Sequence, residues 1–118
     1  MKLIETYEKY KMIDSTFNSF IENLLEGNLE EYSEMIEKKL TEYKDMFESL
    51  KVESDTIEVD EEKTNDLRDL KYLIVDSFFL IIDLENFYKY KEFERFKMRA
   101  VNHINKRRRA SFAQYFSK

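Results

Sequence analysis

Glycine and proline, the two residues that most often interrupt regular structure, are almost absent from this chain. Its 118 residues include one glycine, Gly27, and no proline. Little in the sequence therefore obliges the backbone to turn, and long uninterrupted helices are favoured. Glu, Lys, Leu and Met are good helix formers, whereas the many Phe, Tyr and Ile are only fair ones, so packing has to supply much of the stability.

Apolar residues recur in alternating steps of three and four along the first half of the chain, as they do on the buried face of a helix. The first predicted helix covers residues 3–26 and ends where Gly27, in a left-handed conformation, would form its C-cap. Asn28 would then be the N-cap of a second helix over residues 29–50, with Glu31 completing a capping box. A connection this short makes the two helices an antiparallel hairpin.

The second half of the chain predicts two more helices. Residues 67–88 are apolar on most sides, which is typical of a central helix packed against several neighbours. The apolar stripe then changes phase, so a bend or short break should fall within residues 86–92. A basic C-terminal helix covers about residues 92–117. It should end or protrude from the bundle at residues 106–109, where Arg108 interrupts its apolar stripe.

The segment between the second and third predicted helices breaks the pattern and is strongly acidic. Residues 51–66 contain seven acids and two lysines, a net charge of −5. Connections in bundles usually run about 2–8 residues, so this one is long unless the flanking helices extend into it. The expected fold is all-α, a four-helix up-down bundle with a long acidic connection between helices 2 and 3, in one domain over residues 1–118. Three helices with a bent last helix is the alternative.

Positive charge gathers at the other end of the chain. From Arg95 onward there are eight Lys or Arg and no Asp or Glu, although the whole chain has a formal net charge of −5. Clustered charge of one sign attracts ligands of the opposite sign. Guanidinium groups and the aromatic rings interleaved with them also suit contacts with phosphates and bases. The candidate binding residues are Arg95, Arg99, His103, Lys106, Arg107, Arg108 and Arg109.

This charge pattern favours a non-enzymatic interaction or regulatory protein that docks its basic helix on an acidic macromolecular partner, either a protein or a larger assembly. Phage-type inhibitors, immunity proteins and small assembly subunits include small acidic helical proteins of this kind, a likeness at the level of fold alone. A nucleic-acid-binding subunit that contacts phosphates is the alternative, which the overall negative charge weakens. We expect the acidic segment 51–66 to lie near the basic helix and compete with its ligand.

One pattern of acids raises a catalytic alternative. Glu31 and Glu34 form the kind of E-x-x-E pair that all-α nucleotide pyrophosphatases set opposite an E-x-x-D pair to hold Mg²⁺. Asp66 and Asp69 lie at a suitable distance along the chain but have Asp where Glu is expected. A Mg²⁺-dependent nucleotide hydrolase is therefore a weak candidate, and a solvated helix face explains these acids better.

Two acids and the single histidine allow more than one interpretation. Asp76 and Asp83 lie two turns apart on the most apolar predicted helix. A narrow stripe facing solvent is the favoured interpretation, and an interhelical pair with arginines of the last helix is the alternative. His103 should be a surface residue beside Arg99 and Arg107, because these three residues are spaced four apart.

Several functional classes are disfavoured by residues that the chain lacks. Without cysteine it has no disulfides or thiolate sites, and one histidine does not support a zinc or di-iron centre, so no cofactor is expected. One glycine cannot build a glycine-rich phosphate loop. The N-terminus lacks a signal peptide's apolar region, and the most apolar run is short, so we expect a cytoplasmic protein with no membrane span. The 18 Tyr and Phe residues exceed what a small bundle buries, which leaves a homodimer open.

Overall fold

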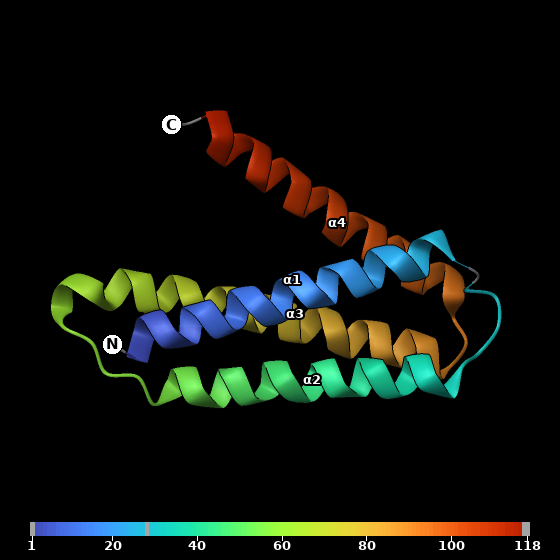
Figure 1. The fold of residues 1–118 in the computed structure, drawn as a ribbon, viewed down its shortest axis with the longest axis horizontal. Coiled ribbons are helices and arrows are strands. Elements are labelled where there is room, and N and C mark those ends of the chain that lie inside the picture. Colours follow the sequence, from blue (N-terminus) through green and yellow to red (C-terminus); the bar gives the residue numbers. More distant parts are fainter. Residues whose placement is uncertain (1, 28, 117–118) are drawn as a thin grey trace.

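Helices make up nearly all of the chain that can be described (Figure 1). The computed structural model describes residues 2–27 and 29–116, with the side chains of residues 2–27 and 29–109. Over these residues the predicted all-α fold class is confirmed, because no strand is present. The helices are α1 Lys2–Glu26, α2 Glu34–Asp55, α3 Thr64–Lys89 and α4 Phe93–Phe116, with a single turn of 3₁₀ helix, η1, at Glu61–Lys63.

The core forms where the apolar stripes of α1, α2 and α3 face one another. Successive helices run in alternating directions (Figure 1), and α3 packs against each of the other three. This central place agrees with the apolar surface that the sequence predicts for most of α3. Burying a large apolar side chain contributes about 1.5–3 kcal/mol. The fully buried side chains include Phe17, Ile21, Leu40, Phe47, Ile74, Ile81, Leu84 and Tyr88.

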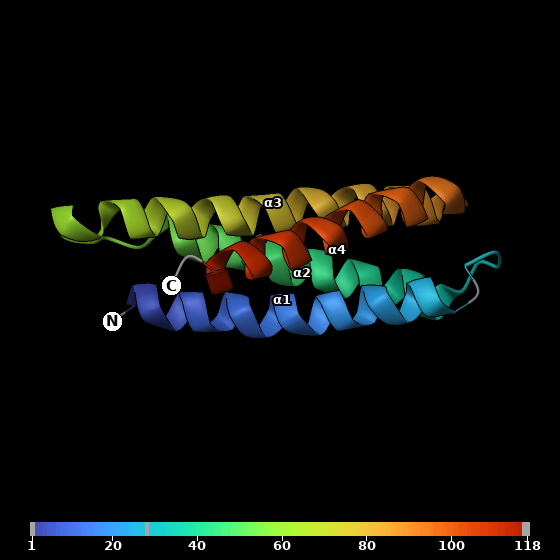
Figure 2. The same cartoon turned by 90° about the horizontal axis from the view of Figure 1, so that it is seen from above.

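The fourth helix, α4, packs on the other three over only part of its length. Seen from above, it lies over the groove between α1 and α3 (Figure 2). Seen from the side, it rises away from them toward its C-terminal end (Figure 1). Phe96, Ala100 and Ile104 are buried in its first half, whereas Arg108 and Arg109 are exposed. The contact therefore ends where the apolar stripe of α4 is interrupted.

The end of α1 differs from the prediction. The helix ends at Glu26 as expected, but Gly27 does not adopt a left-handed conformation. Its N–H instead donates to the carbonyl oxygens of Asn23 at 3.1 Å and Leu24 at 3.2 Å, as an N–H inside a helix would. The predicted left-handed C-cap is therefore wrong. Asn28, the predicted N-cap of the next helix, lies outside the described residues.

The second helix, α2, begins at Glu34, later than predicted. Leu29 is only 1% exposed, so the chain enters the core before the helix starts. Ser33 is the N-cap, and its hydroxyl accepts a hydrogen bond from the N–H of Ile36 at 3.5 Å. The backbone N–H of Ser33 donates to the Tyr88 hydroxyl at 2.8 Å, which ties the start of α2 to the end of α3. The predicted capping box is therefore wrong.

The acidic segment forms a shorter connection than its composition suggested, because both flanking helices extend into it. α2 continues to Asp55 and α3 begins at Thr64, which leaves residues 56–63 with η1 among them. Figure 1 shows this connection at the end of the molecule opposite the turn between α3 and α4. Acids at the end of α2 pair with lysines of α1 and α3, as Lys9–Glu53 at 2.8 Å and Lys71–Asp55 at 3.7 Å.

The turn between α3 and α4 falls inside the predicted window and is built without glycine. Lys91 has a φ of 60°, in the left-handed region that glycine usually occupies. The N–H of Glu92 donates to the carbonyl of Phe87 at 2.8 Å, and the N–H of Lys91 donates to that of Tyr88 at 3.0 Å. These two bonds form a Schellman motif, which ends α3 and lets the chain reverse direction.

Replacing Tyr88 by Phe should destabilise the protein by about 1 kcal/mol, because the half-buried N–H of Ser33 loses its acceptor while the ring packing is kept. Chemical denaturation of both proteins measures the difference. Tyr72→Phe, at a ring that is 64% exposed, is the matched control and should leave the free energy of unfolding unchanged. Equal effects of the two substitutions would contradict the role assigned to the Tyr88 hydroxyl.

Candidate functional site

All seven predicted binding residues lie on α4, but they have different surroundings. Within the described residues, three of the arginines form ion pairs with acids of α1 or α3. These pairs are Arg99–Asp83 at 3.1 Å, Arg107–Asp14, and Arg108–Glu22 at 3.9 Å. The helices beneath α4 therefore neutralise part of its charge. The predicted contact between α4 and the acidic segment 51–66 is not formed by any side chain that is described.

The remaining cations of α4 are open to solvent. The Arg95 side chain is 68% exposed and pairs at 3.6 Å with Glu92, the residue just before α4. Lys106 and Arg109 are exposed and form no ion pair with a described side chain. The Arg108 side chain is also 72% exposed, although its guanidinium lies 3.9 Å from the carboxylate of Glu22. We call Arg95, Lys106, Arg108 and Arg109 the outer cations of α4.

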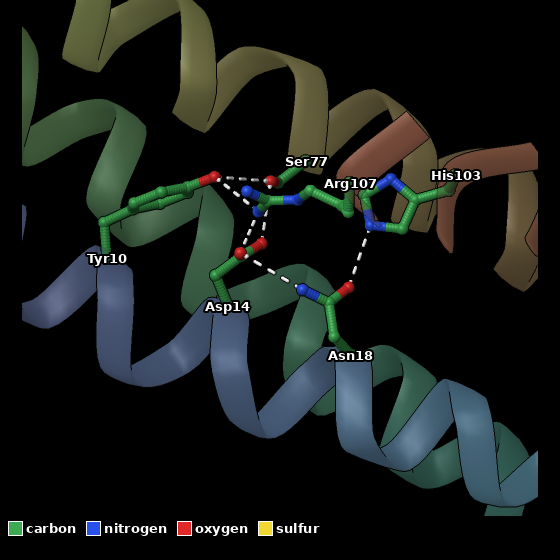
Figure 3. A network of polar contacts seen from close by, with 6 residues as sticks. All are labelled: Tyr10, Asp14, Asn18, Ser77, His103 and Arg107. Carbon is green, nitrogen blue, oxygen red and sulfur yellow. Dashed lines mark hydrogen bonds and ion pairs between the residues drawn. The ribbon is translucent and has the colours of Figure 1, made fainter. Parts of the chain in front are cut away.

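A buried polar network lies beneath α4 and joins three helices (Figure 3). At its centre is Asp14 of α1, which is only 6% exposed. Its carboxylate accepts hydrogen bonds from Ser77 of α3 at 3.3 Å, from Asn18 of α1 at 3.2 Å, and from Arg107 of α4. Arg107 also donates to the Tyr10 hydroxyl at 3.0 Å, and that hydroxyl lies 3.3 Å from the Ser77 hydroxyl.

This network fixes where α4 crosses α1, because a buried carboxylate is costly without a charged partner. Sequence reasoning grouped Arg107 with the ligand-binding cations and did not single out Asp14. The signal was available: Asp14 follows Tyr10 by four residues and precedes Phe17 by three, so it occupies an apolar position of the α1 stripe. Arg107 likewise follows the buried Ile104 by three residues.

His103 extends the network and is not the surface residue that the sequence suggested. It is half-buried, and its Nε2 lies 2.8 Å from the side-chain oxygen of Asn18. Because the amide of Asn18 donates to Asp14, its oxygen is left to accept a hydrogen bond from the histidine. Burial lowers the pKa of His103 from 6.5 to about 4, with the charges of Arg99 and Lys106 acting in the same direction. The ring is therefore neutral at pH 7.

The sequence allowed two interpretations of Asp76 and Asp83 on α3, a stripe facing solvent or an interhelical pair, and each residue follows a different one. Asp76 is exposed, as expected for a stripe facing solvent. Asp83 instead accepts a hydrogen bond from the Nε of Arg99 at 3.1 Å, so the interhelical pair is formed there. This pair holds α4 against α3, as the Arg107 pair holds it against α1.

A cleft opens where α4 rises from the groove between α1 and α3. It has a volume of about 300 Å³. Tyr10 of α1 and Leu73 and Leu80 of α3 supply its apolar lining. Its charged lining has both signs, since Asp76 of α3 faces Lys106 and Arg107 of α4.

The acids proposed for a Mg²⁺ site are not brought together. Glu31 and Glu34 lie at the start of α2, whereas Asp66 and Asp69 lie in the first turns of α3, beyond the other end of α2. The 22 residues of α2 span about 33 Å, far more than a shared ion allows. Within the described part of the chain, no group of three or more acidic or histidine side chains could hold a metal ion.

Comparison with known proteins does not assign the chain to a family. No family model, curated protein or solved structure matches it significantly. Among the helices described, none is long and apolar enough to cross a membrane. The exposed surface of α4 and its contacts are therefore the features of the molecule that point to a function.

Arg107→Met should destabilise the protein by about 2–4 kcal/mol, because it leaves the Asp14 carboxylate buried without its charged partner. The double variant Asp14→Leu/Arg107→Met should recover most of this loss, since both charges are then removed. Chemical denaturation of the wild type, the two single variants and the double variant completes the thermodynamic cycle.

Arg109→Met is the matched control, because it removes an exposed arginine from the same helix. It should change the free energy of unfolding by less than about 0.5 kcal/mol. If Arg107→Met proved as mild as Arg109→Met, the network would not be holding α4 in place.

Stability should fall between pH 6.5 and pH 4 because of His103. Its pKa is about 4 in the folded protein, below its ordinary 6.5, so the unfolded chain takes up this proton first as the pH falls. His103→Gln keeps a hydrogen-bond donor for Asn18 but does not titrate. The wild type and the variant have the same carboxylates, so the titration of these acids cancels in the comparison. The stability of the wild type relative to the variant should decrease as the pH falls from 6.5 to 4, and should be constant above pH 6.5. A difference independent of pH would show that the histidine is not buried as a neutral group.

Proposed function

We propose that this protein is a non-enzymatic interaction protein that binds an acidic surface of a protein partner through the outer cations of α4. One observation carries the proposal: α4 keeps exposed positive charge after α1 and α3 have paired with its inner arginines. The exposed residues are the outer cations Arg95, Lys106, Arg108 and Arg109.

The paired and the exposed arginines have different roles in this proposal. Arg99 and Arg107 hold α4 in a fixed direction, because their partners Asp83 and Asp14 belong to other helices. The outer cations are then presented on a rigid helix, so that little backbone entropy is lost on binding. Exposed charges of one sign speed the encounter with an oppositely charged surface and make the binding sensitive to salt.

The four helices act as a scaffold in this view, arranged as an up-down bundle whose acidic connection lies away from the binding surface. Phage-type inhibitors, immunity proteins and small assembly subunits bind partners through such compact helical surfaces. The overall charge of −5 favours a protein partner over nucleic acid, because dedicated nucleic-acid binders are usually basic as a whole.

Reversing two outer cations tests the proposal. Lys106→Glu/Arg109→Glu should weaken partner binding by about tenfold or more, since both side chains are exposed and pair with no described acid. Affinity capture from the native host identifies the partner, and titration with the purified partner gives the dissociation constants. The control is Lys38→Glu/Lys39→Glu, which makes the same change of charge at exposed sites on α2. Unchanged binding by the α4 variant, or equal loss in the control, would contradict the proposal.

The ionic-strength dependence of the same binding separates a protein partner from nucleic acid. Contacts with phosphates release counterions, so the affinity for DNA or RNA of any sequence would fall steeply with salt. Nuclease treatment before capture should leave a protein partner bound. Loss of all captured material on nuclease treatment, with steep salt dependence, would replace the proposed partner by nucleic acid.

A further inference from the structure

The groove between α1 and α3 continues beyond the point where α4 rises from it, and its walls there are apolar and open. Ile4 is 58% exposed, Tyr7 is 40% exposed and Leu73 is 37% exposed. Together with Leu3 and Leu70 they line a hollow of about 400 Å³. Single apolar residues at a surface are ordinary, but a contiguous apolar hollow is typical of a place where another chain packs.

This open groove and the cleft under α4 adjoin at Leu73, which lines both of them. Phe79, which is 56% exposed, lies at the cleft and adds to the uncovered apolar surface. In a regular bundle the fourth helix would cover the whole groove. Here α4 covers only part of it, and the first turns of α1 lie outside its reach (Figure 1, Figure 2).

The chain's own α4 does not fill the open part of the groove while its anchors hold. It is one continuous helix from Phe93 to Phe116, and the pair between Arg107 and Asp14 sets its direction. Its last turns therefore rise from the groove (Figure 1). Asp76 and Lys106 both line the cleft, yet they form no ion pair across it, as expected if α3 and α4 diverge there.

We propose that a second copy of the chain fills the open groove with the end of its α4, so that two copies exchange these ends and form a symmetric dimer. The sequence of this end, residues 110–118, contains Phe112, Tyr115 and Phe116 and a single charge, at Lys118. Burying these aromatic residues against another apolar surface is favourable. Each copy offers one groove and one projecting helix, which is what a closed two-fold interface requires.

Charge also fits this exchange. The charged residues that line the open groove are Lys63, Asp66 and Asp69, a net negative set. Residues 106–109, which lead into the exchanged end, are all basic. An acidic helix from another protein would meet Asp66 and Asp69 with charge of the same sign, so a basic occupant such as α4 is favoured.

The exchanged end is long enough to cover the open groove. From Arg109 to Phe116, α4 extends about 10 Å at 1.5 Å per residue. The residues of α1 that line the open groove run from Leu3 to Tyr7, about 6 Å. The end of one α4 therefore spans the α1 side of the open groove of the other copy.

Analytical ultracentrifugation over a wide range of protein concentration tests the dimer. We expect a species of twice 14.5 kDa that dissociates on dilution. Leu73→Lys, which places a positive charge in the groove, and a chain ending at Arg109 should each weaken dimerisation by about tenfold or more. The control is Met35→Lys, the same kind of change at a side chain that is 77% exposed on α2. Circular dichroism establishes that each variant is folded.

Because the chain has no cysteine, engineered cysteines identify the occupant of the groove. Ile4→Cys in one copy and Phe116→Cys in another should form a disulfide between chains when the two proteins are mixed and oxidised. Met35→Cys should form no such bond with Phe116→Cys. A single chain carrying both Ile4→Cys and Phe116→Cys should likewise link to other chains.

Three results would overturn the exchange. They are a monomer at every concentration, a dimer insensitive to Leu73→Lys, and a disulfide that forms only within one chain, which would mean that α4 closes over its own groove. Leu73→Lys leaves the outer cations unchanged, so it should weaken the dimer and keep partner binding. Failure of the exchange and failure of the proposed function are therefore told apart in this one variant.

Discussion

Asp14 lies in a stripe of α1 in which the neighbouring positions carry core side chains. Tyr10 and Phe17, one turn to either side, are buried, and Asp14 itself is only 6% exposed. A charge in such a place destabilises the fold unless it is paired and hydrogen-bonded. The fourth helix supplies the opposite charge through Arg107, and the third supplies a hydroxyl through Ser77. The need to satisfy this one carboxylate therefore decides where α4 crosses the other helices.

Because α4 crosses the other helices there, its cations fall into two groups, one paired with acids and one exposed. Arginines on the inner side, such as Arg99 and Arg107, pair with acids of α3 and α1. Other cations of α4, such as Lys106 and Arg109, are exposed and pair with no described acid. The last turns of α4 rise from the groove (Figure 1), which leaves the apolar wall around Leu73 uncovered. The path of α4 thus leaves two surfaces uncovered. The proposed partner depends on the exposed basic surface, and the proposed dimer depends on the open groove.

The sequence predicted the features that follow from the spacing of apolar residues along a helix. It did not predict the features that depend on contacts between residues far apart in the chain. The stripes predicted four helices and the burial of residues such as Phe17 and Ile74, because each stripe repeats within one helix. The start of α2 was missed because Asn28 and Glu31 suit a capping box by spacing, whereas the chain buries Leu29 first. Which acid pairs with which cation could not be predicted, since the contact between Arg107 and Asp14 joins residues 93 positions apart.

Native-state hydrogen exchange on the monomer, followed by mass spectrometry, tests most directly whether Asp14 holds α4 in place. Wild type and Asp14→Asn are compared, because the variant keeps the shape of the side chain and removes its charge. The account predicts that α4 loses protection over residues 96–107 in the variant, while the buried segments of α2 and α3 exchange as they do in the wild type. Unchanged protection of α4, or an equal loss in all the helices, would contradict it.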